Sequence, residues 1–500
     1  MSLLEQIAEC RRERVRLEGP ELGASLPPRR QVPIVPFLGG EQPALICEIK
    51  RRSPSRGDIA PGLDAVAQAG RYSDAGIRFL SVLTEEDHFG GSLADLIAVK
   101  QRCPQLAVLR KDFLLDEADL EVSARAGADA VLLLAALHDG SALRRLCRRA
   151  QELGLAALVE VHDLAETARA REARPALTGV NSRDLGSFRV DPLAPLALRP
   201  AIDWDTTLVY ESGVRGPEGV LLARCGSFDA VLVGEAAVRR PQGVGELASA
   251  LDSPLAVRDF WARVAARLGT SGRSAGIPRA SKPGYAVGVK PGLLPGLRPL
   301  VKICGLTRPG DARLAADLGA DLLGFVFAPS ARRADPSLLR ELDGLDVLKV
   351  GVVTEPQGTA QARALLEQGL LDALQLHGEE RPAECLAAGF PYVKALRLHE
   401  PADVARAGEY GCPRVLADAW SEEAPGGTGR RVPRELVEKL AAERPLWLAG
   451  GLGPDNVREV VRRWHPELVD ASSRLEASPG VKDRAALERF FAEIDEGGAA

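Results

Sequence analysis

The chain has 500 residues, of which 46% are hydrophobic and 27% charged, and its formal net charge is −5 at pH 7. This balance is typical of a globular protein with large buried cores, and the length fits two α/β barrels of roughly 250 residues each. Because acidic and basic residues are mixed along the chain, the sequence offers neither a nucleic-acid-binding face nor a polybasic membrane anchor.

Targeting and disulfide signals are also missing from the sequence. Residues 1–17 carry charged side chains and no apolar core, so we do not expect a signal peptide, and no apolar run approaches the roughly 18 residues of a membrane helix. The 8 cysteines are scattered, without a Cys-x-x-Cys pair or a zinc-ligand spacing. We therefore expect a reduced, cytoplasmic protein that contains no structural metal.

The first half of the chain alternates apolar strands with helices. Apolar residues at helical spacing predict a helix over 3–17. Candidate strands, largely apolar and ending in polar residues or glycine, follow at 45–50, 79–84, 107–111, 130–135, 156–161, 177–181, 208–211 and 230–234. Helical stretches separate them, most clearly 117–126 and 142–153. Such strands indicate a parallel sheet that is covered on both faces.

A second round of strands begins after residues 269–299, where glycine and proline crowd together as in a linker. The second set lies at 300–304, 322–327, 347–353, 373–377, 392–396, 415–419, 446–450 and 468–472. Two rounds of strands predict an α/β fold of two tandem (β/α)8 TIM barrels. We place the domains at 1–268 and 300–500, with the linker between them.

Polar side chains stand at the predicted carboxyl ends of the first-half strands. Glu48 and Lys50 are two residues apart on one strand, so both should face the barrel interior at its mouth. Later strands end in Lys111, Glu160, Asn181 and Glu211. Any one of them alone would be read as half of a surface ion pair. Together they indicate an active site, because barrel enzymes keep their sites at this mouth and desolvated charges there need a function.

The surrounding motifs resemble indole-3-glycerol phosphate synthase. They are Glu48–Ser55, Ser81–Glu85, Phe89–Ser92, Leu109–Phe113, Leu158–His162, Gly179–Leu185, Glu211–Gly213 and Val233–Ala236, in order over most of residues 45–240. The resemblance implies cyclisation, decarboxylation and dehydration of an anilino-deoxyribulose phosphate.

The same resemblance implies a role for each matching position. Lys111 is the general acid at the sugar carbonyl, and Glu160 handles a proton in the dehydration. Lys50 pairs with the substrate carboxylate, while Glu48 and Asn181 orient substrate groups and Glu211 belongs to the same catalytic set. The phosphate is expected where glycines expose backbone N–H groups after the last two strands. The residues expected to bind substrate or phosphate are Ser53, Arg183, Ser212, Gly213 and Gly234.

The second half places a thiol, Cys304, after its first strand and a carboxylate, Asp418, at the end of its sixth. Taken singly, they would be read as a buried small residue and a helix cap. Their surroundings resemble phosphoribosylanthranilate isomerase over about residues 300–495. The matching motifs are Lys302–Thr307, Gly324–Phe327, Ser330–Arg332, Leu374–Gly378, Gly426–Gly429, Leu448–Leu452 with Asn456, and Val469–Ser473.

This second resemblance implies an Amadori rearrangement of an aminoaldose to an aminoketose. Asp418 is then the acid that opens the furanose ring, and Cys304 is the base, acting as a thiolate stabilised by positive potential. Arg332 is expected to hold the anthranilate carboxylate. The pocket and phosphate residues are Gln375, His377, Gly429, Gly451 and Ser472.

Arg474 stands where the isomerase pattern usually has the glycine of Ser-Ser-Gly. A bare backbone can approach a phosphate closely, whereas arginine adds a Cβ and a fork of donors that suits phosphate. We expect Arg474 to contact the phosphate, directly or through water. The alternative is a side chain turned to solvent.

The sequence thus predicts two consecutive steps of tryptophan biosynthesis, catalysed by a monomer on phosphorylated anthranilate-sugar substrates. No cofactor, metal, nucleic acid or membrane partner is implied. One alternative is an active synthase barrel fused to a non-catalytic scaffold or effector-binding barrel. A weaker one is a pair of unrelated sugar-phosphate aldolases or epimerases, since phosphate-binding barrels host many chemistries.

Overall fold

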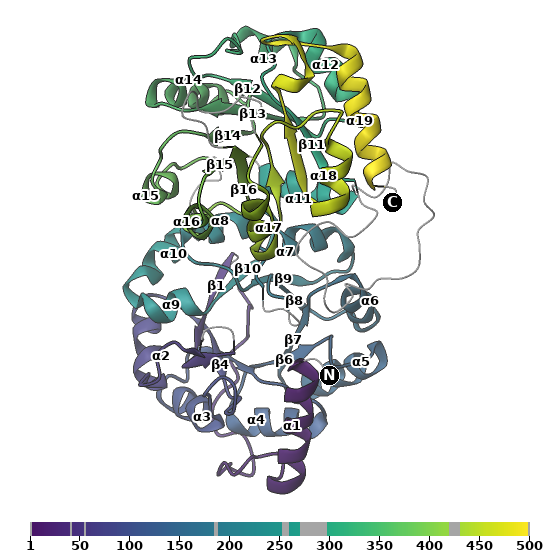
Figure 1. The fold of residues 1–500 in the computed structure, drawn as a ribbon. Coiled ribbons are helices and arrows are strands. Elements are labelled where there is room, and N and C mark those ends of the chain that lie inside the picture. Colours follow the sequence, from purple (N-terminus) through teal and green to yellow (C-terminus); the bar gives the residue numbers. More distant parts are fainter. Residues whose placement is uncertain are drawn as a thin grey trace. The chain divides into compact units, whose positions relative to one another are not determined.

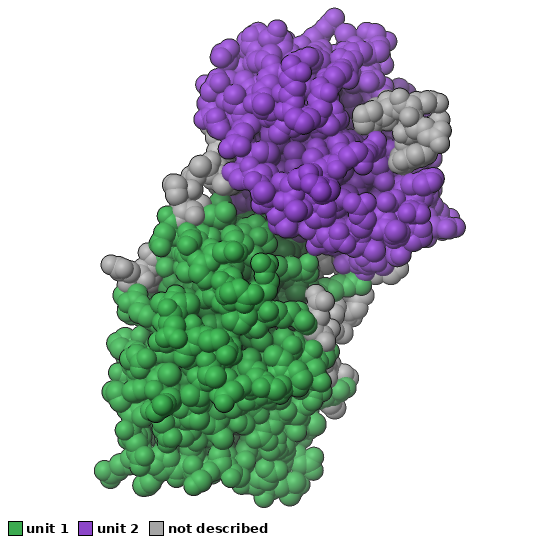
Figure 2. Space-filling model, turned by 90° about the vertical axis from the view of Figure 1, so that its left-hand side faces the viewer, with its two compact units in different colours: residues 1–254, 283–288 green, residues 255–282, 289–500 purple. Residues whose placement is uncertain are grey.

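The computed structural model describes residues 3–40, 43–54, 57–184, 189–252, 260–270, 298–419 and 431–498. Most of the predicted linker and the predicted phosphate-site residue Gly429 lie outside these ranges. The described residues form two compact units, one holding those up to 252 and the other those from 260 onward (Figure 2). Among the helices within these ranges, none is long and apolar enough to cross a bilayer.

Parallel strands close a barrel in the first unit (Figure 1). They are β1 (Ala44–Ile49), β4 (Phe79–Leu83), β5 (Ala107–Lys111), β6 (Ala130–Leu134), β7 (Ala156–Val161), β8 (Leu177–Asn181), β9 (Thr207–Glu211) and β10 (Ala230–Val233). The first strand, β1, pairs with both β4 and β10, and this pairing closes the sheet. Each predicted first-half strand is confirmed, with ends that agree to within about one residue.

Helices follow the strands around the outside of this barrel (Figure 1). They are α2 (Ala65–Asp74), α3 (Leu93–Arg102), α4 (Glu117–Ala126), α5 (Gly140–Glu152), α6 (Leu164–Ala173), α7 (Ala194–Leu198), α8 (Pro217–Cys225), α9 (Glu235–Arg239) and α10 (Val244–Asp252). Helices α2 to α6 begin at the N-cap residues Asp64, Ser92, Asp116, Asp139 and Asp163. Each of these side chains accepts a backbone N–H that the first helical turn leaves free. The predicted extra helix is α1 (Leu3–Glu18), and a short hairpin of β2 (Arg52–Ser53) and β3 (Gly57–Asp58) follows β1.

The second unit closes a barrel with the same order of parallel strands. They are β11 (Leu300–Ile303), β12 (Leu322–Val326), β13 (Leu348–Val353), β14 (Ala373–Leu376), β15 (Tyr392–Leu398), β16 (Val415–Ala419), β17 (Trp447–Leu448) and β18 (Leu468–Ala471). The helices are α12 (Pro309–Asp317), α13 (Ser337–Glu341), α14 (Pro356–Glu367), α15 (Pro382–Leu386), α16 (Pro401–Arg406), α17 (Arg434–Glu443), α18 (Val457–Trp464) and α19 (Arg484–Gly498), with a hairpin of β19 (Glu476–Ser478) and β20 (Val481–Lys482). The predicted fold class, two tandem TIM barrels, is confirmed.

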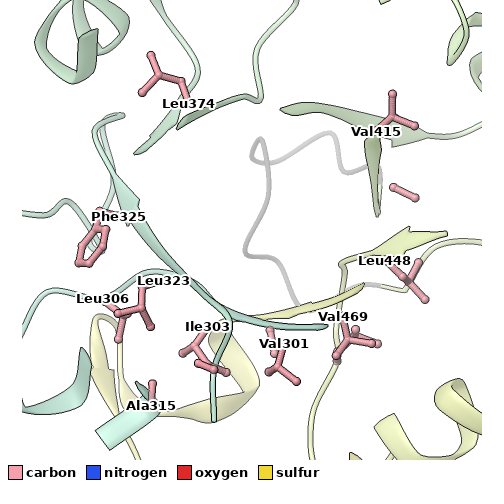
Figure 3. Packing of buried hydrophobic residues seen from close by; sticks show 14 of the residues in the cluster. Val301, Ile303, Leu306, Ala315, Leu323, Phe325, Leu374, Val415, Leu448 and Val469 are labelled. Carbon is pink, nitrogen blue, oxygen red and sulfur yellow. The ribbon is translucent and has the colours of Figure 1, made fainter. Parts of the chain in front are cut away.

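Side-chain alternation along the strands decides which residues reach the lumen. Figure 3 shows Val301 and Ile303 of β11 pointing outward from the strand, and Leu323 and Phe325 of β12 do the same. These residues are fully buried between the barrel wall and the helices that surround it. Because successive strand residues face opposite sides, the intervening Lys302 and the following Cys304 face the interior. The apolar face thus builds the core and the polar face builds the site.

Helix α11 (Phe260–Thr270) belongs to the second unit, although the composition-based boundary at residue 268 grouped most of it with the first. The Trp261 ring lies 5.8 Å from the Trp447 ring, and Arg263 Nη1 lies 2.7 Å from Asp372 Oδ1. These partners stand at the start of β17 and just before β14. Helix α11 therefore contacts the amino ends of the strands, opposite the mouth where barrel enzymes keep their sites.

We expect a fragment of residues 255–500 to be more stable than one of residues 298–500. Burying an aromatic side chain contributes about 2 kcal/mol, so loss of the Trp261 contact should lower the Tm by roughly 4–8 °C. Thermal unfolding of the two fragments measures this difference. A Trp261→Ala variant of the longer fragment should fall between them. Equal Tm values for the two fragments would contradict the assignment of α11 to this unit.

Candidate active sites

The first barrel brings its predicted polar residues together at the strand ends. Lys111 Nζ lies 3.1 Å from Glu211 Oε2, 3.6 Å from Glu48 Oε2 and 4.0 Å from Glu160 Oε2. These side chains come from β5, β9, β1 and β7, so only closure of the barrel makes them neighbours. All four are buried or nearly so, which strengthens the interactions among their charges.

The two remaining predicted catalytic residues join this cluster. Lys50 forms an ion pair with Glu48. Asn181 Nδ2 donates a hydrogen bond of 3.0 Å to Glu160 Oε1. The arrangement therefore offers cations, carboxylates and an amide within reach of one bound molecule.

The charges in this cluster set the protonation state of each group. Burial lowers the pKa of Lys111, but the carboxylates of Glu211, Glu48 and Glu160 raise it more, so the pKa is raised. Burial and the neighbouring Glu160 raise the pKa of Glu211. Burial also opposes ionisation of Glu160, yet His162 and Lys111 hold its pKa below the usual range. Lys111 is thus charged and able to donate a proton, and Glu160 is ionised and able to accept one.

His162 is a buried residue of this site to which the sequence analysis gave no role. Its Nε2 lies 3.1 Å from Glu160 Oε1, and its Nδ1 lies 2.9 Å from Glu166 Oε2. Burial lowers the pKa of His162, but the two glutamates raise it to about 10. The signal in the sequence was a histidine two residues after Glu160, which puts both on one face of the strand end.

The loops after β9 and β10 hold the predicted phosphate-site residues. Ser212 and Gly213 both have positive φ, +67° and +77°, a conformation that is strained for serine and easy for glycine. A Cβ on Gly213 would lie 2.9 Å from Ser182 Oγ, and one on Gly234 would lie 2.5 Å from Glu48 Oε1. Gly234 is the residue before α9, so its loop adjoins the Glu48–Lys50 pair.

Two further predicted binding residues lie in neighbouring loops. Arg183 follows β8, and its backbone N–H donates to Asn181 Oδ1 at 2.9 Å. Ser53 lies in the hairpin after β1, where it pairs with Gly57. Both residues therefore adjoin strands that supply the cluster.

In the second barrel, side-chain contacts run between the strands that carry Cys304 and Asp418. Lys302 Nζ lies 2.5 Å from Asp470 Oδ2 and donates to Gln375 Oε1 at 2.8 Å. Gln375 Nε2 lies 3.0 Å from His377 Nδ1, and His377 Nε2 lies 3.1 Å from Asp418 Oδ2. A Cβ on Gly324 would lie 2.7 Å from Cys304 Sγ, so the glycine of β12 leaves room for the thiol.

The electrostatics of Cys304 differ from the expected thiolate. Burial raises the pKa of the thiol, Lys302 and Lys482 lower it, and Asp470 adds to the rise. The two lysines supply the positive potential that we expected, but burial outweighs them. Cys304 is therefore a thiol in the unliganded protein, and it must lose its proton before it can act as a base.

Comparisons with known proteins match each barrel to a different family. The family model described as indole-3-glycerol phosphate synthase matches residues 11–247, and the model described as N-(5'phosphoribosyl)anthranilate (PRA) isomerase matches residues 301–493. An indole-3-glycerol phosphate synthase of Pelodictyon phaeoclathratiforme is 43% identical over 42% of this chain and 82% of its own length. An N-(5'-phosphoribosyl)anthranilate isomerase of Thiobacillus denitrificans is 40% identical over 39% of this chain and 96% of its own. The chain belongs to both families.

A single relative also covers both barrels. A multifunctional tryptophan biosynthesis protein of Schizosaccharomyces pombe is 30% identical over 92% of this chain. The match spans 60% of that relative's length. The tandem order of a synthase-family barrel and an isomerase-family barrel is therefore found in another protein.

Residues near Cys304 form a charged cluster in the isomerase-family barrel. Arg332 Nη2 lies 2.9 Å from Glu476 Oε2, and Lys482 Nζ lies 2.9 Å from Glu476 Oε1. Ser472 Oγ donates to the backbone oxygen of Cys304 at 3.0 Å. Arg332 and Ser472 were expected from the motifs, whereas Glu476 and Lys482, which the hairpin β19–β20 brings beside them, were not.

Arg474 lies next to the loop that precedes α18. Its Nη1 donates to the Gly451 backbone oxygen at 3.3 Å, and its Nη2 lies 2.6 Å from Asp455 Oδ2. Its side chain is about one-third exposed. Arg474 thus adjoins the predicted phosphate-site residue Gly451 and has a carboxylate partner of its own.

Proposed function

We propose that this chain is a bifunctional enzyme that catalyses two consecutive steps of tryptophan biosynthesis. The isomerase-family barrel would rearrange N-(5'-phosphoribosyl)anthranilate to the carboxyphenylamino-deoxyribulose phosphate. The synthase-family barrel would convert that product to indole-3-glycerol phosphate. The observation that carries the proposal is the cluster of Lys111 with Glu48, Glu160 and Glu211 in the first barrel, and a row of contacts from Lys302 to Asp418 supports it in the second.

In the isomerisation, Asp418 gives a proton to the furanose ring oxygen, and the nitrogen lone pair forms a C=N bond as the C–O bond breaks, which leaves a protonated imine. Cys304, as a thiolate, then removes the proton from C2, and the electrons of that C–H bond form the enolamine. Tautomerisation of the enolamine gives the aminoketose. Lys302 and Lys482 favour the thiolate at this stage. General acid and base catalysis of this kind contributes about 10²–10⁴-fold for each group.

In ring closure, the charged Lys111 gives a proton to the ketone oxygen as the aromatic ring carbon attacks the carbonyl carbon. Carbon dioxide then leaves the attacking ring carbon, and the electron pair of that bond restores the aromatic ring. Loss of water then completes the indole. Glu160 is ionised, which suits it to move a proton in the dehydration. Lys50 and Glu48 sit beside Gly234, where a carboxylate and hydroxyls of the substrate can be held.

Substrate binding in the isomerase-family barrel uses the charged cluster near Cys304. Two cations, Arg332 and Lys482, share a single carboxylate, Glu476, so the cluster keeps a net positive charge. This charge supports the role of Arg332 in holding the anthranilate carboxylate. We assign Gln375 and His377 to the walls of the pocket and Ser472 and Gly451 to phosphate binding, as the family resemblance implies; Gly429, assigned to the same role, is outside the described residues.

The test is a coupled assay with the purified full chain. N-(5'-phosphoribosyl)anthranilate is supplied, and formation of indole-3-glycerol phosphate without any added enzyme supports the proposal. Ring closure from supplied aminoketose phosphate without isomerisation would instead favour a non-catalytic second barrel. Trapping of a substrate adduct by borohydride would favour an aldolase that uses a lysine Schiff base. The monomeric state and the cytoplasmic location remain predictions.

We expect Arg474→Gly to raise the isomerase KM about 3- to 10-fold with little change in kcat, because uniform phosphate binding is lost. The KM of the parent should also depend more on salt than that of the variant. The matched variant Asp455→Asn keeps the arginine but removes its partner, so it should lower the KM. An unchanged KM in both variants would favour the solvent-facing alternative.

A further inference from the structure

The buried lysine Lys302 lies in the lumen of the isomerase-family barrel and has no role in the mechanism beyond its charge. It precedes Cys304 by two residues, so both face the interior of the barrel. Its ammonium contacts the Asp470 carboxylate at 2.5 Å and donates to Gln375 Oε1 at 2.8 Å. The side chain is 3% exposed, which makes these contacts independent of bulk water.

The ammonium fixes the orientation of the Gln375 side chain. An ammonium group only donates hydrogen bonds, so it can bind the amide oxygen but not the amide nitrogen. The amide NH₂ must therefore point to its other neighbour, His377 Nδ1, which lies 3.0 Å away. A flipped amide would set NH₂ against the ammonium and leave two donors facing each other.

The oriented amide in turn fixes the tautomer of His377. An NH₂ group donates, so Nδ1 must accept and cannot carry a proton. The ring proton of the neutral imidazole is then on Nε2, which lies 3.1 Å from Asp418 Oδ2. The hydrogen bonds from Lys302 through Gln375 to His377 thus run in one direction, and they leave the Nε2 proton beside Asp418, to which this structure shows no hydrogen bond yet.

The direction of these hydrogen bonds matters for acid catalysis by Asp418. Once Asp418 has given its proton to the sugar, its carboxylate gains an N–H donor from His377, and a hydrogen bond to an ion is stronger than one between neutral groups. The opposite tautomer would present a lone pair to the new carboxylate. Of the charged or titratable groups in the described residues, Asp418 on β16 lies beside His377, Asp470 on β18 interacts with it electrostatically, and Lys302 on β11 reaches it through Gln375.

We propose that Lys302 is a positioning residue of the isomerisation, which orients the Gln375 amide and thereby sets His377 in the Nε2–H tautomer that serves Asp418. This inference rests on the proposed role of Asp418 as the acid. It adds that Lys302, two residues before Cys304, also decides whether His377 presents an N–H donor to Asp418. The tautomer exists without substrate, so it can be tested apart from the reaction.

The test is ¹⁵N NMR of the full chain labelled at histidine, read near pH 8. The chain has 6 histidines, and the signals of His377 are those lost in His377→Asn. The Nε2–H pattern is expected for His377 in the parent. Lys302→Met should mix the tautomers or reverse them. An Nδ1–H pattern in the parent, or an unchanged pattern in the variant, would overturn the proposal.

A second variant covers the case in which Lys302→Met does not fold. Gln375→Glu has nearly the same shape and keeps a partner for Lys302, but its carboxylate only accepts. The carboxylate should draw a proton to Nδ1 of His377. If His377 in this variant still carried its proton on Nε2 alone, the proposal would be wrong. The matched control is Lys349→Met, which removes a buried lysine from β13 of the same barrel and should leave the tautomer unchanged.

Kinetics separate positioning from a merely structural role. Lys302→Met should lower the isomerase kcat about 10- to 100-fold and change KM only a few-fold, because the lost interaction forms in the transition state. Lys349→Met should stay within about two-fold of the parent. If the parent shows the tautomer but no isomerase activity, the proposed function fails and the inference about the tautomer stands.

Discussion

Replacing Lys111 with methionine should reduce ring closure by about 10²–10⁴-fold and leave isomerisation within a few-fold of the parent. The charged Lys111, which we propose as the proton donor of ring closure, lies beside the carboxylates of Glu48, Glu160 and Glu211. Methionine keeps most of the side-chain volume but can neither donate nor carry charge. Supplied aminoketose phosphate measures ring closure, and supplied N-(5'-phosphoribosyl)anthranilate measures isomerisation.

The reciprocal variant is Cys304→Ala, which should abolish isomerisation and spare ring closure. The thiol lies beside Gly324 in the second barrel, and the space it leaves is small. Because Lys111→Met leaves buried carboxylates without their central cation, thermal unfolding must show that the variant is folded. If either change removed both activities from a folded protein, the assignment of one reaction to each barrel would be wrong.

The strands of both barrels could be predicted because a parallel barrel buries both faces of each strand. Near-continuous apolar runs such as 130–134 and 348–353 indicate strands that are buried on both faces. The polar residues that follow such runs indicate the mouth of the barrel. The lumen-facing residues followed from alternation alone, as Glu48 and Lys50 illustrate. Local sequence fixes which face a side chain takes, and barrel closure then makes neighbours of the strand ends.

Partners that depend on strand register could not be predicted. Lys302 and Asp470 meet because β11 and β18 close the barrel, and the two residues are paired directly in register. Arg332 meets Glu476 only through the hairpin β19–β20, whose Pro479-Gly480 turn could be predicted, but the turn does not tell which side chains the hairpin will contact. The thiol state of Cys304 was also unpredictable, since burial and two lysines oppose each other there.

The contacts of α11 could not be anticipated from the sequence for a similar reason. Composition marks where a linker begins, but it cannot say which barrel a preceding apolar helix will cover. That choice depends on Trp447 and Asp372, which lie far along the chain. Contacts between distant residues decide it.

The last expected result concerns His162, whose buried imidazolium lies between Glu160 and Glu166. Its pKa is raised to about 10 in the folded protein, against burial, by the two glutamates. A histidine with a raised folded pKa contributes stability that is fully present below the unfolded value of about 6.5. That contribution is lost as the pH rises through about 10, by up to about 1.4 kcal/mol per pH unit.

His162→Asn should therefore destabilise the synthase-family unit most near pH 6, and the deficit should shrink steadily toward pH 10. The measurement is the Tm of that unit in parent and variant across this range. The matched control is His138→Asn, since burial lowers the pKa of His138 and it is neutral in both states above about pH 7. Its deficit should stay constant from pH 7 to 10.

His162→Asn should also lower the kcat of ring closure at neutral pH, because Glu160 loses the cation that keeps it ionised. A deficit for His162→Asn that does not change with pH would show that the ring is neutral and that Glu160 is held ionised by Lys111 alone.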